Sequence, residues 1–252
     1  MSGNAFKDYN ISKSSYADYV SVRSILDSVF NVKIKPAGST QFFEEGHLWQ
    51  TQESRSDLDF VVEMSKQDII DIVESHAFFL THRKFGNTVS TLVNIHGKQI
   101  HVDLMPTVDA DNEAWVMTGG SSNFKGVVRN VLLCYLARLF SESETERLGE
   151  ETKWTIAFPG GMGLKQNGIC LNRSTSPGFI LGKLGIANND EQIKTSRTFE
   201  GLVSLVSWDK QKLERFKDYA KEQWLYKKSP EVFDSAFDYL DRIQGRTVFC
   251  RD

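Results

Sequence analysis

Several features that would assign this chain to a common class of protein are missing from its sequence. It has no run of about 18 apolar residues, the length needed for a membrane-spanning helix, so the sequence predicts no membrane partner. Its cysteines, Cys134, Cys170 and Cys250, lie far apart without CxxC spacing, which argues against a zinc ribbon or a disulfide framework. Residues 1–13 are polar and lack the apolar segment of a secretory signal. Together these absences predict a cytoplasmic protein.

The chain also lacks an excess of positive charge. Its formal net charge is −3, which excludes a globally basic nucleic-acid-binding protein. Acidic residues are nevertheless absent from residues 114–141 and 152–189, and both windows contain lysine and arginine. Two interpretations stay open: one surface that faces a polyanion, or packed segments that happen to lack acids.

What the first half of the chain does contain is clear hydrophobic periodicity. The expected elements are a helix over residues 16–30, strands over 32–36 and 57–64, a helix from Ser65 to about Phe79, and strands over 88–95 and 99–105 joined by a tight turn at residues 96–98. This order predicts an α/β (α+β) fold with helices packed on one side of a sheet.

After Val108 the pattern changes to mostly helical periodicity. The expected elements are a helix with Asn123 as its N-cap, a hairpin turn at residues 166–168, a helix over about 208–226 with Trp208, Phe216 and Trp224 in the core, and a helix starting at residues 229–230 with Phe233, Phe237 and Leu240 buried. We therefore expect two domains, an α/β domain over residues 1–118 and a mainly helical domain with a small β-hairpin over residues 119–252.

Three aspartates stand at positions that strand alternation makes informative. In residues 56–60 (SDLDF), Asp57 and Asp59 project to one face of a strand while the apolar residues project to the other. In residues 100–104 (IHVDL), Asp103 is likewise opposite the apolar positions. If the two strands are neighbours, three carboxylates converge, and their mutual repulsion raises their pKa values unless a cation compensates. Mg²⁺ accepts such oxygen ligands, and two ions can stabilise the attacking and leaving oxygens of a phosphoryl transfer.

Two further features surround these aspartates. Gly38 and Ser39 follow the first strand, where a glycine permits close backbone approach and a serine can bind a phosphate. His101 shares the face of Asp103, where it either orients a phosphate or the metal site, or is simply satisfied by a neighbour. A lone DxD pattern is more often a solvated loop or an edge strand, but the ordered combination with Gly38-Ser39 and a third strand aspartate favours a metal site.

Three motifs together resemble a known superfamily. Residues 36–39 (PAGS), 56–62 (SDLDFVV) and 100–106 (IHVDLMP) are similar to those of the nucleotidyltransferase superfamily typified by DNA polymerase beta. The third motif resembles the branch that contains archaeal CCA-adding enzymes, oligoadenylate synthases and cyclic GMP–AMP synthase-like enzymes. The resemblance covers roughly residues 15–140. It implies a polymerase-beta-like catalytic core with a mixed sheet, followed by a mainly helical substrate-binding domain.

The resemblance also implies roles for the three aspartates. Asp57 and Asp59 would hold two Mg²⁺ ions, for which Mn²⁺ could substitute. Asp103 would complete the catalytic metal site and help to deprotonate the attacking hydroxyl. All three are thus expected to be both catalytic and metal-binding residues.

Four other residues are expected to bind the nucleotide. By resemblance, Gly38 and Ser39 would contact its phosphates. Lys125 and Arg129, one helical turn apart, are the candidates for the basic groups that contact the triphosphate. Residues 40–56 are longer than the equivalent stretch of the superfamily, and they form either a surface loop or an insertion that faces the substrate.

The implied activity is transfer of a nucleoside monophosphate from an NTP such as ATP to a hydroxyl of an RNA, for example a tRNA 3′ end, or of a nucleotide, with release of pyrophosphate. Alternatives within the superfamily are a synthase of nucleotide second messengers and a toxin-like enzyme that modifies proteins. Two alternatives outside it are a non-catalytic module that binds nucleotide or RNA, and a metal-dependent phosphohydrolase on an unrelated α/β fold. The sequence indicates neither the acceptor nor the oligomeric state.

Overall fold

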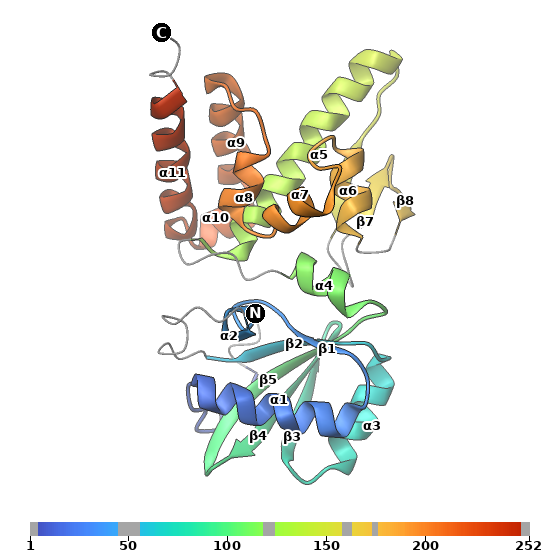
Figure 1. Cartoon of the computed structure of the whole chain (residues 1–252), viewed down its shortest axis with the longest axis vertical. Helices are drawn as coiled ribbons and strands as arrows, with labels where there is room; N and C mark the ends of the chain where they lie inside the picture. The colour runs from blue at the N-terminus through green and yellow to red at the C-terminus, as the bar shows by residue number, and fades with distance from the viewer. Residues whose placement is uncertain (1–4, 45–55, 118–123, 158–162, 173–175, 248–252) are drawn as a thin grey trace. The chain divides into compact units, whose positions relative to one another are not determined.

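The computed structural model describes residues 5–44, 56–117, 124–157, 163–172 and 176–247. These residues form two compact units, one made by the described residues up to 117 and the other by those from 124 onward (Figure 1). Within the described residues, no helix is long and apolar enough to cross a membrane.

The first unit is built around a five-stranded sheet. Its elements are α1 (Tyr16–Phe30), β1 (Ile34–Pro36), α2 (Gln41–Glu44), β2 (Leu58–Val62), α3 (Lys66–Ser75), β3 (Phe79–Phe85), β4 (Thr88–Ile95), β5 (Lys98–Pro106) and α4 (Ala110–Val116). The strand order is β1-β2-β5-β4-β3, in which β2 and β5 are parallel and the other neighbours are antiparallel. This mixed sheet with helices is compatible with the expected α+β class. That it is a polymerase-beta-like core stays a prediction.

Local sequence signals explain the elements that were predicted best. A capping box starts α1, because the side chains of Ser15 and Asp18 each accept the other's backbone N–H. Asn31 ends the helix in the left-handed conformation, with φ of 45°. Between β4 and β5, His96 and Gly97 have φ values of 50° and 82°, the positive pair that a tight hairpin turn requires. The predicted helix and hairpin are both confirmed.

One face of the sheet is covered by α1 and α3 and forms the main core (Figure 1). Its fully buried members come from both helices and from the sheet, and they include Leu26, Ile69, Leu58, Phe60, Ile100, Val102 and Leu104. The helices were predicted to lie on one side only, and α4 corrects this. Ala110 and Ala114 of α4 pack against Ala37 and Val61, and Val61 belongs to the opposite face of β2.

A second correction concerns the segment after α3. The helix capped by Ser65 ends at Ser75 because His76 adopts an extended conformation, with φ of −114° and ψ of 126°. Residues 79–85 (FLTHRKF) then form β3, the edge strand beside β4. Strand alternation was not visible there because one side of an edge strand meets solvent and accepts polar residues.

The second unit is mainly helical and contains a small antiparallel sheet. Its elements are α5 (Gly126–Leu148), β6 (Trp154–Ala157), β7 (Gly163–Gln166), β8 (Ile169–Asn172), α6 (Pro177–Lys183), α7 (Asp190–Thr195), α8 (Phe199–Ser204), α9 (Lys210–Glu222), α10 (Trp224–Lys228) and α11 (Glu231–Thr247). The hairpin predicted at residues 166–168 is confirmed, since Asn167 and Gly168 join β7 to β8 with φ values of 49° and 83°. Asn123, the expected N-cap of α5, lies outside the described residues, and the N-cap position is taken by Lys125.

The last part of the second unit differs in detail from expectation. The helix predicted over about 208–226 is broken at Gln223, whose ψ of 140° separates α9 from α10. Phe216 is fully buried as predicted, but Trp224 is 64% exposed and does not belong to the core. In α11, Phe233, Phe237 and Leu240 are buried as expected.

Candidate metal centre

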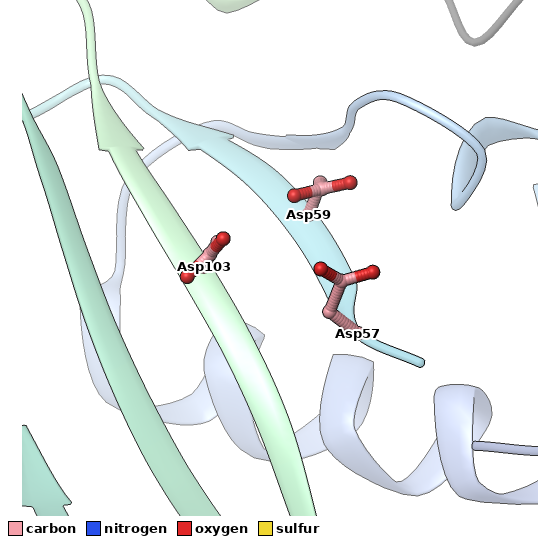
Figure 2. A group of neighbouring side chains, drawn as sticks. All are labelled: Asp57, Asp59 and Asp103. Carbon is pink, nitrogen blue, oxygen red and sulfur yellow. The ribbon is translucent and has the colours of Figure 1, made fainter. Parts of the chain in front are cut away.

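Two neighbouring parallel strands bring the three aspartates together. β2 pairs with β5 in a register that places Asp59 beside Asp103, and Asp57 lies immediately before β2. One ligand oxygen from each carboxylate lies within 4.8 Å of the others. Figure 2 shows the carboxyl groups from the two strands directed into one shared space. The predicted convergence of Asp57, Asp59 and Asp103 is therefore confirmed, and the group is close enough to hold a metal ion.

The electrostatics of this cluster are unfavourable without a counter-charge. Burial raises the pKa of Asp59 well above its ordinary value, and repulsion from Asp57 and Asp103 raises it further. Asp103 is itself buried, with 5% of its surface exposed. Clustered carboxylate oxygens are the donors preferred by hard divalent cations. Both the donor set and the repulsion within it fit such an ion, whose identity as Mg²⁺ stays a prediction.

The carboxylate of Asp103 is held by two buried side chains. Ser90 Oγ donates a hydrogen bond of 2.5 Å to its Oδ1, and His101 Nε2 donates one of 3.0 Å to the same oxygen. The hydrogen-bonding partner of the His101 ring is therefore Asp103 itself. Sequence reasoning missed Ser90 as a site residue. The sequence does show a hydroxyl residue, Ser90, within an apolar strand. Its role as a partner of Asp103 can be recognised only once the two strands are known to pair in this register.

The turn after β1 packs directly against Asp59. Gly38 has a φ of 52°, and a Cβ atom at this position would lie 2.5 Å from Asp59 Oδ2, so only glycine leaves room for the carboxylate. The Gly38 N–H donates to the carbonyl of Met117 at 2.7 Å. Thr40 Oγ1 accepts the backbone N–H of Asp59 at 2.8 Å. The close backbone approach expected of Gly38 is thus made to Asp59, while phosphate binding by Gly38 and the half-buried Ser39 stays a prediction.

The two predicted basic residues belong to the second unit. Lys125 is exposed at the N-cap of α5. Arg129 is fully buried, and its Nε donates to the carbonyl of Ser196 at 2.7 Å. Burial, followed by repulsion from Arg197, lowers the pKa of Arg129 to about 9. In this arrangement Arg129 joins α5 to the end of α7, and contact of Lys125 or Arg129 with a triphosphate stays a prediction.

Comparison with known proteins found no match for this chain. No protein-family model matches the chain, and no curated protein matches it. The likeness to the polymerase-beta superfamily therefore rests on the three sequence motifs. The geometry by itself defines a three-carboxylate site that could hold a metal ion.

Proposed function

We propose that the chain is a metal-dependent nucleotidyltransferase, which moves a nucleoside monophosphate from an NTP to a hydroxyl of an RNA or nucleotide. The observation that carries this proposal is the placement of Asp59 and Asp103 on adjacent parallel strands, with Asp57 immediately before the first strand and one oxygen of each aspartate within 4.8 Å of the others. Two hydrophobic strands that expose acids on one face, next to a turn with a required glycine, form a site suited to phosphate chemistry.

In the proposed reaction, the oxygen of the acceptor hydroxyl forms a bond to the α-phosphorus of the NTP. The bond between that phosphorus and the bridging oxygen to the β-phosphate breaks, and pyrophosphate leaves. We assign acceptance of the hydroxyl proton to Asp103. Bound Mg²⁺ or Mn²⁺, held by the three aspartates, would supply neutralisation of the charge on the phosphates.

The strained electrostatics of the site favour an enzyme over a passive binding module. A carboxylate that binds no cation gains nothing from two like charges beside it, and the raised pKa of Asp59 records this penalty. Active sites are where such perturbed groups concentrate. An RNA or nucleotide acceptor is favoured because the acid-free stretches at residues 114–141 and 152–189 contain basic residues, such as the exposed Lys125, that suit an anionic partner.

A labelled-nucleotide assay tests the proposal. The protein is incubated with each α-³²P-labelled NTP and with Mg²⁺ or Mn²⁺, in the presence and absence of total tRNA, and the products are separated. We expect label in the RNA or in a nucleotide product, and loss of that label in Asp59→Asn. Asp71→Asn is the matched control, since Asp71 is exposed on α3 and accepts a hydrogen bond from Gln67.

The product identifies which function operates. Labelled RNA supports an RNA acceptor, and a labelled cyclic or oligomeric nucleotide supports second-messenger synthesis. Label on protein indicates a protein-modifying enzyme, and free nucleoside monophosphate without transfer indicates hydrolysis. If no label moves to any acceptor and nucleotide affinity is the same in the wild type and in Asp59→Asn, the enzymatic proposal is wrong.

A further inference from the structure

The Asp103 carboxylate of the metal centre accepts hydrogen bonds from two buried side chains. Ser90 Oγ and His101 Nε2 donate to Oδ1, at 2.5 Å and 3.0 Å. Figure 2 shows one oxygen of Asp103 directed toward Asp59 and the other directed away from it.

The two donors are fixed by the sheet and shielded from water. Ser90 is fully buried on β4 and pairs with Asp103 across the strands, while His101 stands two residues before Asp103 on β5 and is 3% exposed. The ring of Phe6 meets the imidazole of His101 edge to face, with 5.3 Å between their centroids. Phe6 is itself 1% exposed, and Arg83 lies over its ring at 5.5 Å. Both hydrogen bonds are thus formed in a dry, closely packed environment, where they are stronger than in water.

We propose that Ser90 and His101 are positioning residues of the metal centre, which hold Oδ1 of Asp103 and so fix the orientation of this carboxylate as a ligand for the cation. This inference rests on the proposed function of the same site. Two donors to one carboxylate oxygen fix the rotation of the carboxylate about the Cβ–Cγ bond. A ligand fixed in this way loses no rotational freedom on binding a metal, so the site is organised before the cation arrives.

The donor types are suited to this role. A hydroxyl and an imidazole N–H both donate to an anion, and neither adds a negative charge to a site that already has three carboxylates. Hydrogen-bonding partners of metal ligands commonly account for about 10- to 100-fold in metal affinity. The same magnitude is expected here for each donor.

Metal binding without nucleotide provides the test. Titration of the full chain with Mn²⁺, followed by electron paramagnetic resonance of the free ion, gives the affinity independently of turnover. We expect Ser90→Ala and His101→Leu each to weaken Mn²⁺ binding by about 10- to 100-fold. Ser90→Thr and His101→Gln, which keep a donor, should retain most of the affinity. Thr91→Val is the matched control, because it removes a buried hydroxyl of the same strand that donates to the Thr81 carbonyl.

A double-mutant cycle separates positioning from general structural damage. In an Asp103→Asn background, Ser90→Ala should have no further effect on Mn²⁺ affinity, because its partner is already lost. Unchanged affinity in Ser90→Ala and His101→Leu, with wild-type binding intact, would overturn this inference and leave the proposed function standing. Wild-type protein that binds no Mn²⁺ would instead remove the basis of the proposed function. If Ser90→Ala does not fold by circular dichroism, the comparison of His101→Leu with His101→Gln decides in the same way.

Discussion

The two faces of the five-stranded sheet carry opposite chemistry although they share the same strands. On the face covered by α1 and α3, Phe60 and Leu104 are fully buried in an apolar core. One residue earlier on each strand, Asp59 and Asp103 turn to the other face and meet in a cluster of carboxylates. Strand alternation therefore separates the apolar core from the carboxylate cluster at single-residue spacing.

Truncation on the apolar face should have the largest effect on stability. Phe60 is fully buried, and its ring is stacked on Tyr19 with 6.1 Å between centroids. Phe60→Ala should lower the free energy of unfolding by about 3–5 kcal/mol, because it removes buried apolar area and leaves a cavity. Urea denaturation followed by circular dichroism measures this. Phe85→Ala makes the same chemical change at a side chain that is 47% exposed, and a comparable loss there would contradict the assignment of the core.

α4 packs on the face of the sheet that carries the aspartates, and it contains a buried titratable group, Glu113. It is 7% exposed, and burial raises its pKa from 4.5 to about 7. Because the folded-state pKa is raised, the native protein holds this proton more tightly than the unfolded chain does. Stability from this group is therefore complete below pH 4.5 and is lost as the pH rises to about 7.

Glu113→Gln should remove this pH dependence. The variant should match the wild type near pH 5, and it should be more stable at pH 8 by at most about 3 kcal/mol, the upper limit that linkage allows for such a shift. Urea denaturation at both pH values measures the difference. A stability difference that does not change with pH would show that Glu113 titrates normally in the folded state.

The glycine beside the three carboxylates permits an internally controlled comparison. Gly38 and Gly86 share a φ of 52°, but a Cβ at Gly38 would collide with Asp59 while one at Gly86 meets nothing within 4 Å. Alanine at either position should lose about 1–2 kcal/mol because of the left-handed backbone. Only Gly38→Ala should also weaken Mn²⁺ binding, since its methyl group displaces the Asp59 carboxylate. Equal Mn²⁺ affinity in the two variants would show that the close approach of Gly38 does not position Asp59.

The sequence predicted those parts of this arrangement that depend on local signals. Alternation in residues 56–60 placed Asp57 and Asp59 on one face, and the positive-φ turn at His96 and Gly97 placed the β4–β5 hairpin. The parallel pairing of β2 with β5 joins segments about 40 residues apart. The sequence prediction therefore had to assume that these two strands are neighbours, and only the tertiary structure shows that they pair.

The parts that were missed depend on contacts between distant segments. β3 was not predicted, because its edge position lets polar residues stand where a central strand would be apolar. α4 is short, and its Ala110 and Ala114 gain their role only from contact with the sheet. Ser90 could be recognised as a partner of Asp103 only from the register of β4 against β5. For Trp224 the prediction of a buried residue was wrong. Its helical spacing indicated burial, but the helix is broken at Gln223 and the side chain is exposed.

The smallest expected effect, and the sharpest contrast between the two faces, comes from neutralising Asp59. Its folded-state pKa is raised by burial and by the neighbouring carboxylates, so the metal-free protein loses stability as the pH rises through the raised pKa. Asp59→Asn removes one of the three charges. In EDTA at pH 8 it should therefore stabilise the protein by about 1 kcal/mol, the usual size of a single stabilising substitution. Thermal unfolding measures this as a higher Tm.

Addition of Mn²⁺ should reverse the order of the two proteins. Ligand binding to the native state raises the stability of the wild type with increasing metal concentration, whereas Asp59→Asn, with weakened binding, should gain little. Asp71→Asn should follow the wild type with and without metal, because Asp71 lies on α3, away from the carboxylate cluster. Phe60→Ala, one residue further along the same strand, should lose stability and still gain from Mn²⁺. If Asp59→Asn is destabilised in EDTA, burial and repulsion do not penalise the Asp59 carboxylate in the folded protein, and the electrostatic argument for a bound cation fails.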